Sequence, residues 1–368
     1  MTTVTGSVSF TLPADNDPAP PTAAQIVASL SADTASLKAL AAALGVSGVG
    51  PPPPPPPACA MTSTSWIDQS TGSGIYDYKQ YGNYVVQADN WGNLPGQVTW
   101  ANSEKCWGMT NTKTVNTETI QSYAHITRGW MESGALAALS TKNTDGTSTN
   151  DWTTKCGMGI EVNALTKAKV GWTFAAPPAN GTVDGKGNRY DSLIDIYYHT
   201  SATPQGSEFP PMIDVQLIQS LADQVIGSTT FYAYTCAGAH ATEVTIGGNT
   251  YTVFIDQSGG ASFHQAGGHT IALFLQPTAF NSNNANPSWG ANSAVHDVAA
   301  ITKYFMQANP VDNAGKPLLF ADGTTVTAPL IPPSVFLTAI NAGWELDLGP
   351  SFTTTDFWVA MQGEPDGV

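Results

Sequence analysis

Basic residues are scarce in this chain of 368 residues. Lysine and arginine together number 13, against 28 aspartate and glutamate residues, so the formal net charge is −15. A protein that grips nucleic-acid phosphates or an anionic membrane surface needs the opposite charge balance, and we expect neither as a partner. The expected partner is neutral or basic.

Long apolar runs are also missing. No stretch reaches the roughly 18 residues that a membrane-spanning helix requires, and residues 1–7 have neither the basic nor the apolar region of a signal peptide. We therefore expect a soluble protein with no signal peptide and no membrane insertion.

Cysteine and histidine form no metal-binding pattern. The four cysteines are too far apart for a CxxC motif, and no histidine pair has the helical spacing of metal ligands. The sequence predicts no metal and no cofactor. Disulfides remain open, and Cys106 with Cys156 is the first pair to test; the other two cysteines are Cys59 and Cys236.

The first 57 residues differ from the rest. Residues 22–44 are rich in alanine, and their leucine and isoleucine residues alternate at steps of four and three, which predicts a short helix. This helix either packs on its own segment or mediates self-association. Seven prolines at 51–57 then predict a stiff polyproline spacer. We interpret residues 1–50 as an attachment or oligomerisation segment and residues 60–368 as the working domain.

The working domain has the patterning of a β protein. Period-two alternation occurs in eight segments separated by glycine, proline, asparagine and serine clusters: 84–87, 160–163, 192–199, 212–218, 242–246, 251–255, 270–275 and 344–348. So many short strands predict a mostly β fold, a sandwich of two antiparallel sheets. Two helices are expected to interrupt it, one capped by Asp297 and one capped by Ser334 that ends at Asn341.

Carboxylates recur on the polar faces of three of these strands. They alternate with core-type residues such as Ile194 and Ile196, and they are Asp195, Asp214, Glu345 and Asp347. If these faces line one concave sheet, the carboxylates converge in a cleft, which is the arrangement that two-carboxylate hydrolysis of a glycosidic bond requires. The alternative is an outer sheet face whose acidic side chains are solvated.

Several motifs from Tyr84 to the C-terminus resemble glycoside hydrolase family 12. Residues 84–92 end in Asn-Trp-Gly, residues 122–130 read Ser-Tyr-Ala-His-Ile-Thr-Arg-Gly-Trp, and residues 200–207 read Thr-Ser-Ala-Thr-Pro-Gln-Gly-Ser. The resemblance implies a β-jelly-roll sandwich with a concave cleft and endo-hydrolysis of a polysaccharide. The most specific match, Asn-Ala-Gly-Trp-Glu-Leu at 341–346, is similar to the family's Gln-Ala-Gly-x-Glu and implies that Glu345 is the general acid/base.

The nucleophile motif departs from the family pattern. The family's Glu-Ile-Met-Ile-Trp-Leu corresponds to Met-Ile-Asp-Val-Gln-Leu at 212–217, so Met212 stands at the nucleophile position, where a thioether cannot replace a carboxylate. Tyr197 likewise stands where the family keeps an aspartate. Strict alignment therefore predicts an inactive enzyme.

Two nearby carboxylates offer a displaced site. In an antiparallel pair in which Tyr197 faces Met212, Asp195 faces Asp214. We therefore expect Asp214 as nucleophile or base and Asp195 as its hydrogen-bonded partner, with Asp347 as the matching acid if its strand is displaced in the same way. Because aspartate is shorter than glutamate, inversion, which needs carboxyls about 6.5–9.5 Å apart, stays open beside the retention that the resemblance implies.

Aromatic side chains are expected to bind the sugar rings by stacking, although tryptophans can equally be core residues. The predicted substrate-binding residues are Trp91, Trp107, Trp130, Tyr197, His199 and Gln216, whereas Trp172, Trp344 and Trp358 are predicted core residues.

The whole pattern predicts an endo-acting glycoside hydrolase on a spacer, such as the head of a bacteriophage tail protein in the virion or an extracellular enzyme. Residues 1–50 would then contact other tail proteins. The alternatives are a catalytically inactive glycan-binding tail protein, because Met212 and Tyr197 replace family carboxylates, and a purely structural tail component.

Overall fold

The computed structural model describes residues 59–367 except for several internal segments. These are residues 70–76, 95, 112–120, 132–133, 178–181, 184–185, 188, 207–210, 224–241, 257–267, 277–287, 291 and 349–350. The predicted helix at 22–44, the proline spacer at 51–57 and Cys236 lie outside the described residues.

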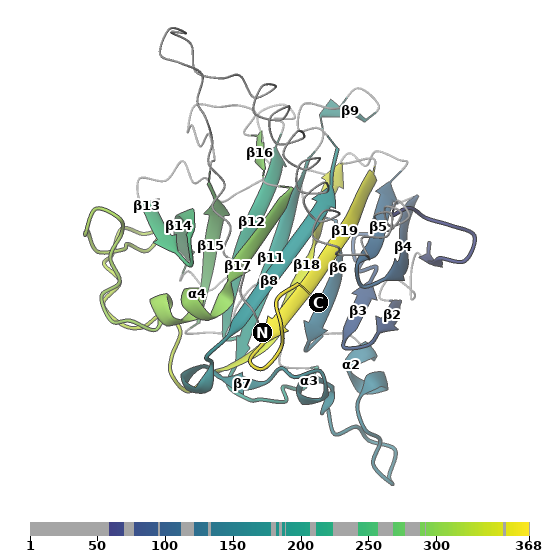
Figure 1. The fold of residues 1–368 in the computed structure, drawn as a ribbon, viewed down its shortest axis with the longest axis horizontal. Helices are drawn as coiled ribbons and strands as arrows, with labels where there is room; N and C mark the ends of the chain where they lie inside the picture. Colours follow the sequence, from purple (N-terminus) through teal and green to yellow (C-terminus); the bar gives the residue numbers. More distant parts are fainter. Residues whose placement is uncertain are drawn as a thin grey trace, which may run out of the picture. The chain divides into compact units, whose positions relative to one another are not determined.

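Two β-sheets form the body of the fold (Figure 1). Sheet A has the strand order β1 (Trp66–Asp68), β4 (Gln97–Ser103), β5 (Cys106–Asn111), β19 (Ser351–Met361), β8 (Ala168–Ala175) and β17 (Ser293–Asp297). Sheet B has the order β13 (Thr242–Ile246), β14 (Asn249–Asp256), β15 (His269–Leu275), β12 (Ile213–Asp223), β11 (Arg189–His199), β18 (Phe336–Leu348), β6 (Ser122–Gly129), β3 (Tyr84–Gln87) and β2 (Tyr78–Tyr81). Outside this order β16 (Ser288–Gly290) pairs with β12 and β7 (Ile160–Glu161) with β18, while β9 (Thr182–Val183) and β10 (Lys186–Gly187) form a separate hairpin.

The predicted fold class, a mostly β two-sheet jelly-roll sandwich, is confirmed. In Figure 1 strands of sheet A overlap those of sheet B and run in nearly the same direction, and the two sheets share one core. The pairings that the structure describes are antiparallel except for β12 with β15, which is parallel. A mixed sheet of this kind needs a long crossover between its parallel strands, and the hairpin of β13 and β14 lies within that connection.

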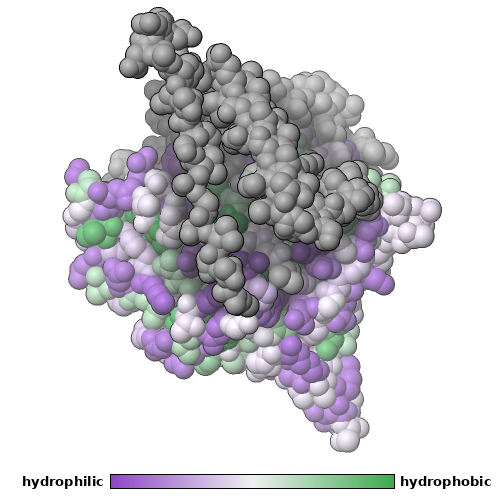
Figure 2. Space-filling view, in the orientation of Figure 1, coloured by the Kyte–Doolittle hydropathy of each residue, from purple (hydrophilic) through white to green (hydrophobic). Residues whose placement is uncertain are grey.

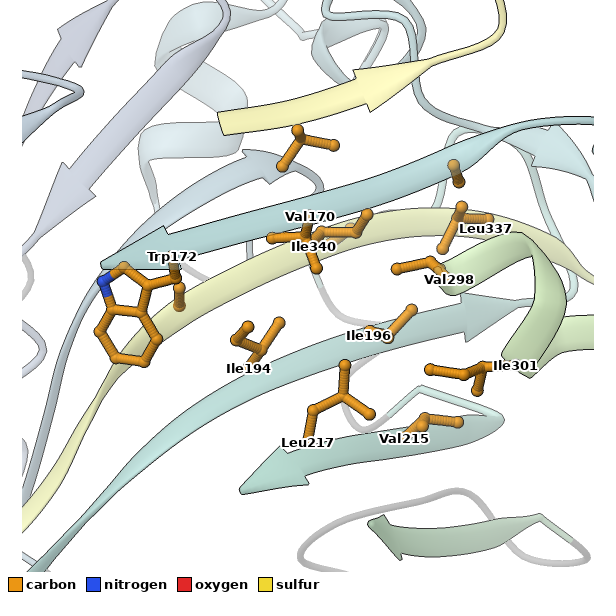
Figure 3. Packing of buried hydrophobic residues seen from close by; sticks show 14 of the residues in the cluster. Val170, Trp172, Ile194, Ile196, Val215, Leu217, Val298, Ile301, Leu337 and Ile340 are labelled. Atoms are coloured by element: carbon orange, nitrogen blue, oxygen red, sulfur yellow. The ribbon is translucent and has the colours of Figure 1, made fainter. Parts of the chain in front are cut away.

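Alternation of apolar and polar residues explains why the sheets stack. On β11, Ile194 and Ile196 are fully buried and face Val170 of β8 across the interior, together with residues of β12, β18 and α4 (Figure 3). Because successive residues of a strand point to opposite sides, the intervening residues of β11 lie on the side of sheet B away from sheet A. We call that side the polar face of sheet B.

Three tryptophans meet in the interior. The ring of Trp344 on β18 lies 4.7 Å from that of Trp107 on β5 and 5.4 Å from that of Trp172 on β8, measured between centroids. The core positions predicted for Trp172 and Trp344 are confirmed, as is that of Trp358, which is also buried. Aromatic pairs at these separations stabilise the contact between sheets beyond the area that they bury.

Among the described residues helices are few and short: α2 (Gly134–Leu139), α3 (Trp152–Lys155), α4 (Val298–Phe305) and the 3₁₀ turn η2 (Val162–Ala164). The predicted cap of α4 is confirmed, because the Asp297 carboxylate accepts a hydrogen bond from the Ala300 amide at 2.9 Å. The helix predicted after Ser334 is wrong, since residues 336–348 form β18 between β11 and β6. Within the described part of the chain, no helix is long and apolar enough to span a membrane.

The predicted disulfide is also wrong. Cys106 pairs with Cys59, at a Cα–Cα distance of 5.4 Å, and Cys156 is a buried free thiol. Sequence spacing alone cannot select among the possible pairings, because only the fold places Cys59 next to β5.

The face shown in Figure 2 carries hydrophilic residues with apolar ones scattered among them. Five large apolar side chains are notably exposed among the described residues: Met61, Ile67, Trp91, Val295 and Val311. Of these, Trp91 alone is a residue for which the sequence predicts a binding role.

Candidate active site

The polar face of sheet B carries four carboxylates on three adjacent strands. Asp191 and Asp195 lie on β11, Asp214 on β12 and Glu345 on β18, with β11 in the middle. The alternation on β11 places them there, because Ile194, Ile196 and Tyr198 fill the interior on the other side. Three of the four are carboxylates that the sequence pattern singles out.

The strand register differs from the predicted one. Asp195 lies opposite Gln216 and Tyr197 lies opposite Asp214, so the prediction that Asp195 faces Asp214 is wrong by one rung. The connection from β11 to β12 sets this register, and a shift of two residues keeps every side chain on its face. Asp195 and Asp214 are thus diagonal neighbours, and the Gln216 amide Nε2 donates a hydrogen bond to Asp214 Oδ2 at 3.0 Å.

Asp191 is a site residue that the sequence analysis missed. It is the Cα partner of Glu345 across β11 and β18, and it is fully buried. It lies one residue before the predicted start of the strand at Ser192, with the same parity as Asp195. Extending the alternation by one residue toward the N-terminus would have found it.

Tyr123 on β6 completes the row. It is the Cα partner of Glu345 on the side opposite Asp191, and its hydroxyl is close enough to Asp195 to act on the pKa of that carboxyl. Tyr123 was not predicted, although it belongs to the motif at 122–130.

Burial and mutual repulsion raise the pKa of the three central carboxyls. The pKa of Asp195 is raised well above its usual value by burial and by the charge of Glu345, although the hydroxyls of Tyr123 and Tyr197 partly oppose this. The pKa of Asp214 is raised by burial and by Asp195, and that of Glu345 by burial and by Asp191. A carboxyl with a raised pKa holds its proton to higher pH than an ordinary carboxyl, which favours the role of general acid for one member of the cluster.

His125 adds no positive charge to the cluster. Burial lowers the pKa of its imidazole to about 4, and its Nδ1 lies 2.6 Å from the backbone oxygen of Tyr123. Its ring stacks on that of Tyr123 at 4.7 Å, and the Asp89 carboxylate lies 3.9 Å from Nδ1. The imidazole is therefore neutral at neutral pH and supports Tyr123 by packing.

Close approach of β18 to β6 explains the glycine in the Asn-Ala-Gly-Trp-Glu motif. A Cβ on Gly343 would lie 2.4 Å from the Ala124 carbonyl oxygen and 2.6 Å from the Cβ of His125. Only glycine fits there without moving the strands, so the motif fixes the position of Glu345 relative to β6.

The predicted stacking residues separate into different environments. Trp91, in the turn after β3, is 44% exposed, and its neighbour Gly92 donates a backbone hydrogen bond to Gln121, next to β6. Trp107 is fully buried between the sheets, so its predicted binding role is contradicted. It lies on sheet A, and strand parity turns its ring toward the interior.

Trp130 and His199 lie at the far end of the polar face and are buried. Their ring centroids are 4.6 Å apart, the Trp130 indole donates to the Gln205 carbonyl oxygen at 3.1 Å, and His199 Nδ1 lies 2.7 Å from Thr338 Oγ1. The half-buried Tyr197 packs against Trp130 with centroids 6.0 Å apart. The buried rings of Trp130 and His199 therefore stabilise the polar face by packing. Among the aromatic residues predicted to bind sugar, Trp91 and Tyr197 are the ones with accessible surface.

The side chain of Asp347 lies outside the described ones. Its backbone falls at a shift in the pairing of β18 with β11, where Arg189 lies opposite Leu348 and Tyr190 opposite Leu346. In the described part of the chain, no group of three or more histidine, cysteine, aspartate or glutamate residues has the arrangement of a metal site.

Comparison with known proteins supports the fold. No family model and no curated protein matches the sequence. Among solved structures, the family 12 xyloglucanase from Bacillus licheniformis matches with 15% identity and a TM-score of 0.50, over 81% of this chain and 100% of the xyloglucanase. The endoglucanase Cel12A from Rhodothermus marinus matches with 17% identity and a TM-score of 0.51, over 82% and 99%. The chain has the fold of the family 12 glycoside hydrolases. At these identities the likeness to family 12 establishes the architecture alone.

Proposed function

We propose that the protein is an endo-acting glycoside hydrolase, in which Glu345 is the general acid/base and Asp214 is the nucleophile. The observation that carries the proposal is the group of carboxyls with raised pKa on one face of sheet B, of which Asp195 and Asp214 are buried and Glu345 is half-buried. Paired carboxyls of unequal proton affinity are the machinery of glycosidic-bond hydrolysis.

The alternation on β12 supports Asp214 as the nucleophile. Val215 and Leu217 point into the core, whereas Asp214 and Gln216 lie on the polar face. The sequence Asp-Val-Gln-Leu-Ile at 214–218 therefore matches the in-and-out pattern of the family's Glu-Ile-Met-Ile-Trp, with an aspartate in place of the glutamate. Aligned in this way, Met212 lies before the motif and its thioether is no obstacle to catalysis.

We propose a two-step reaction for these groups. Glu345 donates its proton to the glycosidic oxygen while Asp214 attacks the anomeric carbon, and the Glu345 carboxylate then takes a proton from the water that releases the sugar. Asp195, diagonal to Asp214, is its acidic neighbour on β11. We propose retention of configuration, tested by the anomer of the first product in ¹H NMR; inverted product would contradict it.

The proposed substrate is a neutral polysaccharide of the plant or cell-envelope type. The charge of −15 disfavours anionic polymers, and the names of the family 12 neighbours, a xyloglucanase and an endoglucanase, make xyloglucan and β-glucan the first substrates to test. Trp91 offers an exposed ring for stacking, and Tyr197 lies directly opposite Asp214.

We further propose that the enzyme works in a virion tail or outside a cell, and that residues 1–50 attach it to other tail proteins or to copies of itself. The Cys59–Cys106 disulfide supports an oxidising location, because such bonds persist there. Detection of the intact chain in purified virus particles or culture medium tests the location, and its confinement to cytosol would contradict the proposal.

The test of function is sugar release from a panel of polysaccharides. We expect oligosaccharides from at least one β-glucan or xyloglucan with the native protein, and a loss of about 10²–10⁴-fold in Glu345→Gln. No release from any polymer, together with glycan binding that is unchanged in Glu345→Gln, would identify a catalytically inactive glycan-binding protein instead. Absence of both release and binding would indicate a structural component.

A further inference from the structure

Asp191 and Glu345 form a pair of carboxyls on neighbouring strands. They are direct Cα partners of β11 and β18, and both side chains lie on the polar face of sheet B. Asp191 is fully buried and Glu345 is half-buried. Directly opposite residues of an antiparallel pair have their Cβ atoms about 4.5–5.5 Å apart, which brings two carboxyl groups into hydrogen-bonding reach.

The surroundings of the pair disfavour two negative charges. Glu345 is flanked by Asp191 on β11 and by the neutral Tyr123 on β6, and the nearby titratable groups are Asp195, His125 and, beyond His125, Asp89. Of the described side chains facing the pair, none is positively charged at neutral pH, since His125 is neutral there. The side chain of Arg189, two residues before Asp191, lies outside the described ones. Two carboxyls this close share one proton rather than ionise together.

We propose that Asp191 is a positioning residue that holds the shared proton on Glu345 and so keeps Glu345 in its acid form. This inference rests on the proposed function of Glu345 and extends it to a residue outside the sequence motifs. Asp191 touches no reacting atom in the proposal, because it acts through Glu345.

The same pair serves both halves of the reaction. In the first half the proton leaves Glu345 for the glycosidic oxygen as the bond from that oxygen to the anomeric carbon breaks and the bond to Asp214 forms. The Glu345 carboxylate then faces the Asp191 carboxylate, and their repulsion makes Glu345 a stronger base toward the incoming water. When the water loses its proton to Glu345 and its oxygen bonds to the anomeric carbon, the bond to Asp214 breaks and the starting state returns.

The experiment is a titration of the Glu345 carboxyl, read by ¹³C NMR of protein labelled at glutamate and aspartate side chains. Glu345→Gln identifies the signal. We expect Asp191→Asn to weaken proton binding at Glu345 by about tenfold or more, which is a shift of about one pH unit, because the repulsion is gone. Glu161→Gln, an exposed glutamate on β7, serves as control and leaves the titration unchanged.

The pH profile of hydrolysis gives a second readout. We expect the basic limb of kcat/KM to move to lower pH in Asp191→Asn, whereas Asp191→Glu, which restores the carboxyl, returns it toward the native position. An unchanged Glu345 titration in Asp191→Asn, or a shift to higher pH, overturns the inference. Because the titration is read without substrate, a protein that cleaves no polysaccharide would contradict the proposed function and leave the shared proton as a separate result.

Discussion

Gln216 donates its amide to Asp214 at 3.0 Å while lying directly opposite Asp195. One side chain therefore stands between two acids, and its hydrogen bond lowers the pKa of Asp214 against the opposing effects of burial and of Asp195. A nucleophile must be ionised, and the pKa of Asp214 is raised overall, so this donor is the described group that favours the ionised form.

Replacing Gln216 by leucine is expected to raise the pKa of Asp214 further, because the hydrogen bond favours the charged carboxylate. The acidic limb of kcat/KM should move to higher pH. A lost hydrogen bond to a charged group, worth about 1.5–3 kcal/mol, corresponds to a fall of roughly 10- to 150-fold in rate. The pH profile measures both; an acidic limb that stays in place would show that Gln216 does not act on the nucleophile.

Asp195→Asn is expected to stabilise the protein at neutral pH. The folded-state pKa of Asp195 is raised, so its favourable contribution is fully present below the unfolded value of about 3.9 and is lost as the pH rises through the folded value. The variant should therefore gain thermal stability at pH 8 and match the native protein near pH 3.5.

Unfolding temperatures at the two pH values measure this difference. Asp145→Asn is the control, because Asp145 is exposed and its hydrogen bonds to Thr147 lower its pKa. It should gain nothing at pH 8. Equal unfolding temperatures of native protein and Asp195→Asn at pH 8 would show that the ionised Asp195 carboxylate does not destabilise the folded state.

Two tryptophans predicted to bind sugar should behave in opposite ways. Trp91→Ala removes a ring that is 44% exposed and should weaken polysaccharide binding by roughly 5- to 150-fold, as expected for about 1–3 kcal/mol, with little change in stability. Trp107→Ala opens a cavity beside Trp344 and should cost about 3–5 kcal/mol of stability.

Affinity electrophoresis measures polysaccharide binding, and denaturant unfolding measures stability. The variant Trp91→Phe, which keeps an aromatic ring, should keep part of the affinity. Normal binding by Trp91→Ala would remove Trp91 from the proposed site.

The Cys59–Cys106 disulfide closes a loop with a sequence separation of 47 residues, and its loss by Cys106→Ser should cost about 4 kcal/mol in the chain-entropy model. Reducing agent should lower the unfolding temperature of the native protein and leave that of Cys106→Ser unchanged. A native protein indifferent to reductant would show that the bond contributes little.

Local sequence patterns predicted the parts of the fold that depend on one strand at a time. The alternation of Ile194 and Ile196 with Asp195 placed the correct face of β11 in the core. It could not fix which residue of β12 lies opposite Asp195, because the connecting segment sets the register. The sequence analysis missed Asp191 for a related reason: the position at which β11 begins depends on its pairing with β12 and β18, which the sequence of β11 alone does not show.

Other errors came from tertiary context. The segment after Ser334 carries a capping residue, yet pairing on both sides with β11 and β6 makes it a central strand. Trp107 is of a residue type that often binds sugars, but its position along β5 places its side chain on the side of the strand that faces the core. Sequence motifs alone could not decide between the two, because only the stacking of sheet A on sheet B turns that ring inward.

The roles of Glu345 and Asp214 are tested most directly by comparing aryl β-cellobiosides with poor and good leaving groups. If Glu345 donates the proton, Glu345→Gln should hydrolyse the phenyl glycoside about 10²–10⁴-fold more slowly than native protein and lose far less on the dinitrophenyl glycoside, which needs no protonation. Asp214→Asn should lose both activities alike. Equal losses on the two glycosides in Glu345→Gln, or full activity in Asp214→Asn, would contradict the assignment.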